Sequence, residues 1–118
     1  MAFDKTKTDP ALGKKVHEHL MLVGVETPVI DNGLTRKEKI DMIQSNFYEI
    51  ATTLGLDLND DSLTDTPKRV AKMYVNEIFW GLDYAAFPKV TVVDNKMQYN
   101  EMVVERGISV QSYCEHHF

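Results

Sequence analysis

The last five residues of the chain hold the side chains best suited to chemistry. Cys114, His116 and His117 bring the only cysteine and two of the four histidines within four positions of one another. Cysteine sulfur and histidine nitrogen are the usual protein ligands of zinc, so the cluster predicts a metal site. The competing interpretation is a buried cysteine at a strand end, followed by histidines without a role. The local chemistry favours metal binding.

The spacing allows two different pairs of ligands. If the chain turns after Cys114, then Cys114 and His117 point to the same side. If the chain stays extended, Cys114 and His116 share a face instead. Glu115 fits two roles equally well: an acceptor that fixes the tautomer of a histidine, or an exposed carboxylate.

One ligand of a catalytic site is missing from this cluster. A catalytic zinc ion usually takes three protein ligands and keeps a fourth position for water. The third ligand must come from His17 or His19, from another chain, or from sequence outside these 118 residues. His17 and His19 fall in a predicted helix and point about 200° apart, at roughly 100° per residue. They cannot act as a pair, and we interpret both as surface histidines.

Arg69 and Lys72 form a second candidate, a basic pair in the first turns of a predicted helix. A helix N-terminus presents free N–H groups and a positive partial charge, so an anion between the two side chains is favoured. Arginine offers bidentate contact to phosphate and lysine a mobile point charge. The residues alone favour the simpler interpretation, a solvated helix face with Arg69 paired to Asp65 or Glu77.

Length and charge exclude several classes of protein. The 118 residues are enough for one hydrophobic core, and a net charge of −5 argues against a surface that binds nucleic acid or an anionic membrane. No apolar run approaches the roughly 20 residues that cross a bilayer, and residues 1–7 lack the apolar stretch of a secretory signal. A single cysteine fits a reducing compartment. We therefore expect a cytoplasmic protein that binds neither nucleic acid nor membrane.

Capping residues and apolar periodicity predict three helices. Asp9 followed by Pro10 is typical of a helix start, and Thr35 with Glu38 three positions later forms a capping box. Glycines mark the three helix ends. The polar residues 1–9 are expected to be mobile. The helices are expected over about residues 10–23, 35–54 and 66–80.

Beyond Tyr84 the apolar pattern changes from helical to alternating, which predicts strands over residues 89–93, 102–105 and 108–113. Helices followed by strands indicate an α+β fold rather than a parallel α/β sheet. We predict a helical region over residues 1–85 and the start of a sheet domain over residues 86–118.

The two candidate sites, in this order, resemble GTP cyclohydrolase I. The similarity is good from about residue 34 to the end. It is carried by short motifs with specific residue types, which are Thr64-Asp65-Thr66-Pro67-Lys68-Arg69, Ala71-Lys72-Met73-Tyr74, Gly81-Leu82-Asp83-Tyr84, Phe87-Pro88-Lys89, Asn95-Lys96-Met97 and above all Cys114-Glu115-His116-His117-Phe118.

This resemblance implies an activity and a set of roles. Enzymes of the family hydrolyse GTP to 7,8-dihydroneopterin triphosphate and formate, the first step toward folate-type pterins, with a zinc-activated water attacking C8 of guanine. By resemblance, Cys114 and His117 are zinc ligands and His116 moves protons at the purine. Arg69 and Lys72 hold the triphosphate. The family fold is a helical part followed by a tunnelling-fold (T-fold) antiparallel sheet, assembled as a homodecamer with sites between subunits.

The chain also departs from the family pattern. Family members continue well beyond this motif, and the further part supplies a second zinc-binding cysteine and the glutamate that grips guanine. We therefore expect this chain to be a fragment that does not turn over GTP alone. The alternative is a truncated, non-catalytic interaction or assembly module derived from the same family.

Overall fold

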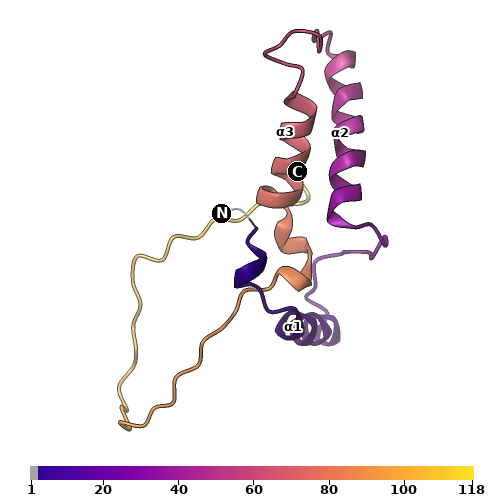
Figure 1. Ribbon diagram of the computed structural model, residues 1–118. Coiled ribbons are helices and arrows are strands. Elements are labelled where there is room, and N and C mark those ends of the chain that lie inside the picture. Colours follow the sequence, from indigo (N-terminus) through magenta and orange to yellow (C-terminus); the bar gives the residue numbers. More distant parts are fainter. Residues whose placement is uncertain (1–2) are drawn as a thin grey trace.

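The computed structural model describes residues 3–118 and is built around two helices packed side by side (Figure 1). Helix α2 covers Arg36–Thr53 and helix α3 covers Thr66–Met73. Their contact is lined by small side chains, since Ala51 of α2 and Ala71 of α3 are both buried. Alanine at both positions lets the backbones approach closely, which is how so short a pair of helices is held together.

The helix starts follow the predicted capping residues. The side chain of Asp9 accepts a hydrogen bond from the Leu12 backbone at the start of α1, Pro10–Val23. Thr35 and Glu38 form the expected capping box of α2. Gly24 ends α1 in the left-handed conformation, with a φ of 71° that favours glycine. These local predictions are confirmed.

The third helix begins at the predicted residue but ends earlier than predicted. The N-cap of α3 is Asp65, whose side chain makes no capping hydrogen bond. The α-helix stops at Met73 and continues as one turn of π-helix, Tyr74–Ile78. The Phe79 backbone N–H closes this turn on the carbonyl of Tyr74 at 2.9 Å. Short 3-10 turns follow over Trp80–Leu82 and Tyr84–Ala86.

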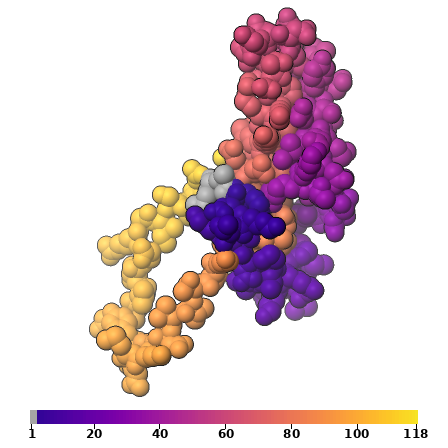
Figure 2. Space-filling model, viewed as in Figure 1, coloured from indigo at the N-terminus to yellow at the C-terminus, as the bar shows by residue number. Residues whose placement is uncertain are grey.

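The predicted T-fold sheet is wrong for this chain. Within residues 3–118 there is no strand, only one isolated antiparallel bridge between Thr8 and Pro88. Residues 87–113 leave the helices as an open extended loop and return to them (Figures 1 and 2). The radius of gyration is 19.3 Å, against about 13.5 Å for a compact chain of this length.

The cause is the absence of anything for these residues to pack against. Val92, Val103 and Val110, on the three expected strands, are 85%, 82% and 81% exposed. A strand that buries neither face gains no apolar contact to offset the entropy of ordering its backbone. Alternating sequence is therefore present without a sheet, and the α+β expectation is replaced by three α-helices and an extended arm, residues 87–113.

Residues 3–9, expected to be mobile, are held against the helices. The backbone N–H of Phe3 donates to the Asn76 carbonyl at 2.8 Å, and the guanidinium of Arg36 lies 3.8 Å above the Phe3 ring. The backbone N–H of Lys89 donates to the Lys7 carbonyl at 3.0 Å. These contacts fix the point at which the extended arm departs. None of the helices within residues 3–118 is both long and apolar enough to cross a membrane.

Candidate functional site

The chain turns directly after Cys114, and the turn brings the sulfur and histidine ligands together. Glu115–His117 form this terminal turn, in which Cys114 Sγ lies 3.6 Å from His117 Nδ1. The His116 and His117 rings meet edge to face, with centroids 4.7 Å apart. One donor atom from each of Cys114, His116 and His117 lies within 4.8 Å of the other two.

The geometry of this cluster suits a tetrahedral ion. Bonds of about 2.3 Å to sulfur and 2.0 Å to nitrogen, at a tetrahedral angle, separate the two donors by about 3.5 Å. The observed separation of Cys114 Sγ and His117 Nδ1 is 3.6 Å. One thiolate and imidazole nitrogens are the donor set that zinc prefers. The turn therefore brings Cys114 and His117 to the same side, which is one of the two arrangements that the spacing allowed, and His116 lies beside them.

The cluster is open to solvent. Cys114, Glu115, His116 and His117 are all exposed, so the competing interpretation, a buried cysteine, does not hold. Exposure leaves room for further ligands and for a substrate. The side chain of Glu115 makes no hydrogen bond to either histidine in the described part of the chain, which favours an exposed carboxylate.

The histidines of α1 lie elsewhere and take other partners. The His17 ring stacks on Tyr84, with centroids 4.2 Å apart and planes at 15°, and its Nε2 bonds the carboxylate of Glu26. His19 joins no potential metal-ligating group among the described residues. Neither residue supplies the third ligand within this chain.

Arg69 is held by neutral acceptors rather than by a carboxylate. Its Nη2 donates to the Ser62 carbonyl at 3.2 Å and to Thr66 Oγ1 at 2.7 Å. Neither of the expected ion pairs, with Asp65 or with Glu77, is formed in the described structure. The charge of Arg69 is therefore not neutralised by the loop that orients it.

The structure does not join the basic pair to the metal-ligating cluster. Lys72 is exposed on α3 and precedes Tyr74 by two residues, about 200° around the helix. Lys72 therefore faces away from the side of Tyr74 that the end of the chain touches. No hydrogen bond or ion pair within residues 3–118 connects Arg69 or Lys72 to the terminal turn.

Aromatic residues between the two sites were not singled out from the sequence. Phe118 packs on Tyr74 and Phe79, with ring centroids 5.3 and 5.1 Å apart. A cavity of about 480 Å³ adjoins these rings and is also lined by Trp80 and Glu115. Tyr74 and Phe79 are five positions apart, about 140° around an ideal α-helix, and a contact with Phe118 across 39 or more residues leaves no local signal.

Residues 43–118 match the GTP cyclohydrolase I family. The chain is similar to GTP cyclohydrolase 1 of Aeromonas hydrophila subsp. hydrophila, with 59% identity over 95 residues that cover 80% of this chain and 44% of the relative. GTP cyclohydrolase 1 of Shewanella oneidensis is 55% identical over 103 residues, which cover 87% of this chain and 48% of the relative.

The chain spans about half the length of the curated relatives it matches. GTP cyclohydrolase 1 of Aliivibrio fischeri (strain MJ11) gives the same result, with 55% identity over 102 residues that cover 86% of this chain and 47% of the relative. The family match includes α3 and the terminal turn with its Cys114 and His117 pair. Because that match covers well over half of the residues, the chain belongs to the GTP cyclohydrolase I family.

Proposed function

We propose that this chain carries one part of a GTP cyclohydrolase I site, which hydrolyses GTP to 7,8-dihydroneopterin triphosphate and formate. The observation that carries the proposal is the 3.6 Å separation of Cys114 Sγ and His117 Nδ1 in the terminal turn. Family membership and 55–59% identity to proteins named GTP cyclohydrolase 1 support the same substrate.

Cys114 and His117 would hold a zinc ion, with the remaining protein ligand coming from outside this chain. Such a zinc ion would supply an activated water as the nucleophile at neutral pH. His116 lies beside the pair and is exposed, so its imidazole can give and accept protons at a purine placed over the turn. We assign His116 this proton-transfer role.

Arg69 and Lys72 would hold the triphosphate of GTP. Arg69 keeps its full charge because only neutral oxygens of Ser62 and Thr66 fix its guanidinium. Since the basic pair and the terminal turn are not joined in this chain, one substrate must bridge them or they must serve sites shared with other chains. We therefore propose that the protein forms a homo-oligomer, a decamer by resemblance. We also propose that it is cytoplasmic.

The metal proposal is tested by titrating the purified chain with Zn²⁺ and measuring the affinity. We expect Cys114→Ala and His117→Ala to lower the affinity by about 10-fold or more, because each removes one of few protein ligands. His19→Ala is the matched control and should leave the affinity unchanged, since His19 lies outside the cluster. Equal affinity in all four proteins would remove the proposed site.

The chain alone should release no formate from GTP. It provides two zinc ligands and one proton-transfer histidine, whereas a catalytic zinc usually takes three protein ligands. The assay incubates the chain with GTP and Zn²⁺ and measures formate. Formate release at a rate above the buffer blank would contradict the proposal that the site is completed by other residues.

The alternative is a non-catalytic assembly module, and one observation favours it. The extended arm, residues 87–113, exposes many apolar side chains, which is typical of segments that bind another protein surface. Self-association without measurable Zn²⁺ binding would support this alternative. Zinc binding that depends on Cys114 and His117 would favour the enzyme.

A further inference from the structure

The terminal turn meets the helical part of the chain at an aromatic cluster. Much of the arm, residues 87–113, stands away from the helices (Figure 2), while residues 109–113 return to line a cavity of about 790 Å³ with Phe79 and Trp80. Within the described structure, no hydrogen bond or ion pair joins residues 114–118 to α2 or α3. The Phe118 ring supplies the aromatic contacts: its centroid lies 5.3 Å from that of Tyr74, with the planes at 24°, and 5.1 Å from that of Phe79, with the planes at 34°.

The π-turn prepares the surface that receives Phe118. In an α-helix, residues five positions apart point about 140° away from each other. Here the bond from the Phe79 N–H to the Tyr74 carbonyl widens the turn, and the two rings lie 5.8 Å apart on one side. The ring of Phe47 in α2 also packs on Tyr74, with ring centroids 5.3 Å apart. One-turn π segments of this kind are frequent at functional sites.

We propose that Tyr74, Phe79 and Phe118 are positioning residues, an aromatic clamp that docks the metal-ligating turn on the helices. The inference rests on the proposed function, because the clamp has a role only if Cys114 and His117 bind a metal ion. Cys114 and His117 can approach each other within the turn by themselves. The clamp fixes where that pair sits relative to α3 and the cavity lined by Trp80.

The clamp is expected to be a weak and reversible contact. Phe118 is 74% exposed, so only one side of its ring is covered. A single aromatic pair shifts an equilibrium by about two- to tenfold. Removal of the Phe118 ring, which makes two such pairs, should therefore lower the ratio of docked to free turn by about tenfold. Because Phe118 is exposed, its removal should not unfold the helices.

The only tryptophan of the chain reports docking directly. Trp80 and Glu115 line the same two cavities, of about 480 and 790 Å³, so a docked turn places its metal close to the indole. Co²⁺ is a suitable probe, since a thiolate bound to it gives a charge-transfer absorption and the ion quenches nearby tryptophan fluorescence. The absorption reports binding at Cys114, and the quenching of Trp80 reports docking.

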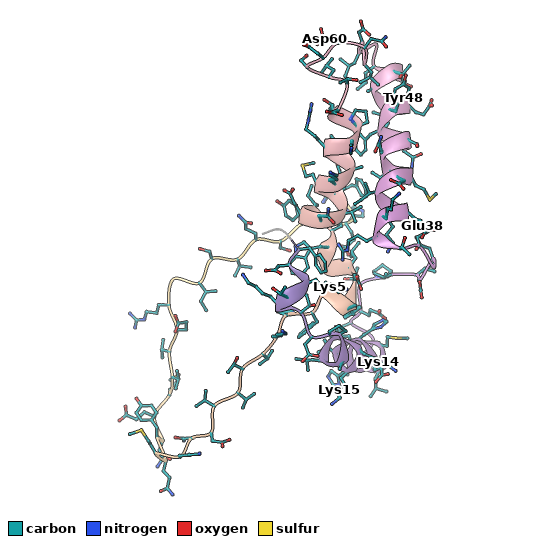
Figure 3. All side chains as sticks on the ribbon, in the orientation of Figure 1. Lys5, Lys14, Lys15, Glu38, Tyr48 and Asp60 are labelled. Atoms are coloured by element: carbon teal, nitrogen blue, oxygen red, sulfur yellow. The ribbon has the colours of Figure 1, made fainter. Side chains whose placement is uncertain are left out.

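The experiment compares the chain with its Phe118→Ala variant at saturating Co²⁺. We expect Phe118→Ala to keep the charge-transfer band and to lose most of the quenching of Trp80. Phe118→Tyr, which keeps the ring, should behave like the unaltered chain. Tyr48→Ala removes an exposed ring of α2 outside the clamp and should have no effect (Figure 3). Circular dichroism of each variant checks that the helices are retained.

The outcomes separate the clamp from the metal site. Quenching of the same strength in Phe118→Ala would overturn the clamp and leave the metal site standing. A charge-transfer band missing from the unaltered chain would remove the metal site and, with it, the role of the clamp. A Phe118→Tyr variant that lost quenching as fully as Phe118→Ala would also overturn the clamp, because the ring would not be the cause.

Discussion

Gly13 is the residue at which the packing of α1 tolerates no side chain. A Cβ atom at this position would lie 1.8 Å from the Tyr84 carbonyl oxygen and 2.9 Å from the Phe87 Cβ. Both neighbours belong to the segment that follows the π-turn, so α1 is held against it by backbone contact. The absence of a side chain is what lets α1 approach so closely.

Gly13→Ala should destabilise the protein by about 1–3 kcal/mol, because the added methyl group must push α1 away from Tyr84. The gain in helix propensity from alanine, about 1 kcal/mol, only partly offsets this cost. Thermal unfolding followed by circular dichroism measures the effect. Gly81→Ala is the matched control, since a Cβ there meets nothing within 4 Å, and its unfolding temperature should stay close to that of the unaltered chain.

The residues of the candidate site could be selected from the sequence, but their contacts could not. Cys114, His116 and His117 stood out by type and spacing, yet only the observed turn shows that Cys114 and His117 lie on the same side. The expected ion pair of Arg69 was wrong, because a neighbouring carbonyl and hydroxyl lie within its reach. Side-chain partners depend on loop geometry, which the order of residues does not reveal.

The start of α2 is the element with the clearest electrostatic signature. Glu38 Oε2 accepts hydrogen bonds from the Thr35 hydroxyl at 2.6 Å and from the Thr35 backbone N–H at 2.7 Å. These two bonds hold the pKa of Glu38 below its usual 4.5, and the bond from the Thr35 hydroxyl has the larger effect. The ionised carboxylate therefore contributes stability above about pH 4.5, and this contribution is lost as the pH falls from 4.5 through the lowered pKa of the folded chain.

Glu38→Gln should make the free energy of unfolding depend less on pH under acidic conditions. Glutamine keeps an acceptor oxygen for the capping box but has no proton to gain. We expect the difference in stability between the unaltered chain and the variant to shrink as the pH falls below 4.5. Denaturant unfolding at several pH values measures this. A difference that stays constant from pH 6 to pH 3 would show that Glu38 does not titrate in the capping box.

Helices were predictable and strands were not, for a physical reason. A helix start depends on residues three positions apart, such as Thr35 and Glu38, so the sequence contains its whole signal. A strand pattern such as residues 108–113 indicates which side chains share a face, but pairing needs a partner segment. No two of the alternating segments pair within residues 3–118, and they remain extended and exposed. The π-turn was also missed, because the apolar residues of the predicted helix over residues 66–80 do not distinguish a π-turn from continued α-helix.

At the scale of the whole molecule, the chain consists of a small helical body and an open arm. The extents of 65 × 32 × 27 Å reflect the loop of residues 87–113 (Figure 2). Only small side chains and Val75 are buried among the described apolar residues. The helical body therefore carries the stability of the chain, and the arm contributes little to it.

Trypsin should cut the arm before it cuts the helices. Lys96 lies in an exposed turn of the arm and Arg106 on its exposed, irregular backbone, so both can enter a protease cleft without a helix opening. Lys15 and Lys37 are also exposed but lie on α1 and α2, so cleavage there requires the helix to open first. Mass spectrometry of a brief digestion identifies the first cuts. Early fragments ending at Lys15 or Lys37 would contradict the division between arm and body.

The π-turn has a consequence for two segments that lie far apart in the sequence. The Phe3 backbone bonds Asn76 and the Phe3 ring approaches Trp80, while Phe118 packs on Tyr74 and Phe79, so both segments meet one short stretch of the chain. A one-residue deletion there would restore α-helical winding and rotate every following side chain by about 100°. The contacts of Phe3 and of Phe118 would then be lost together, so straightening this turn should release both segments at once.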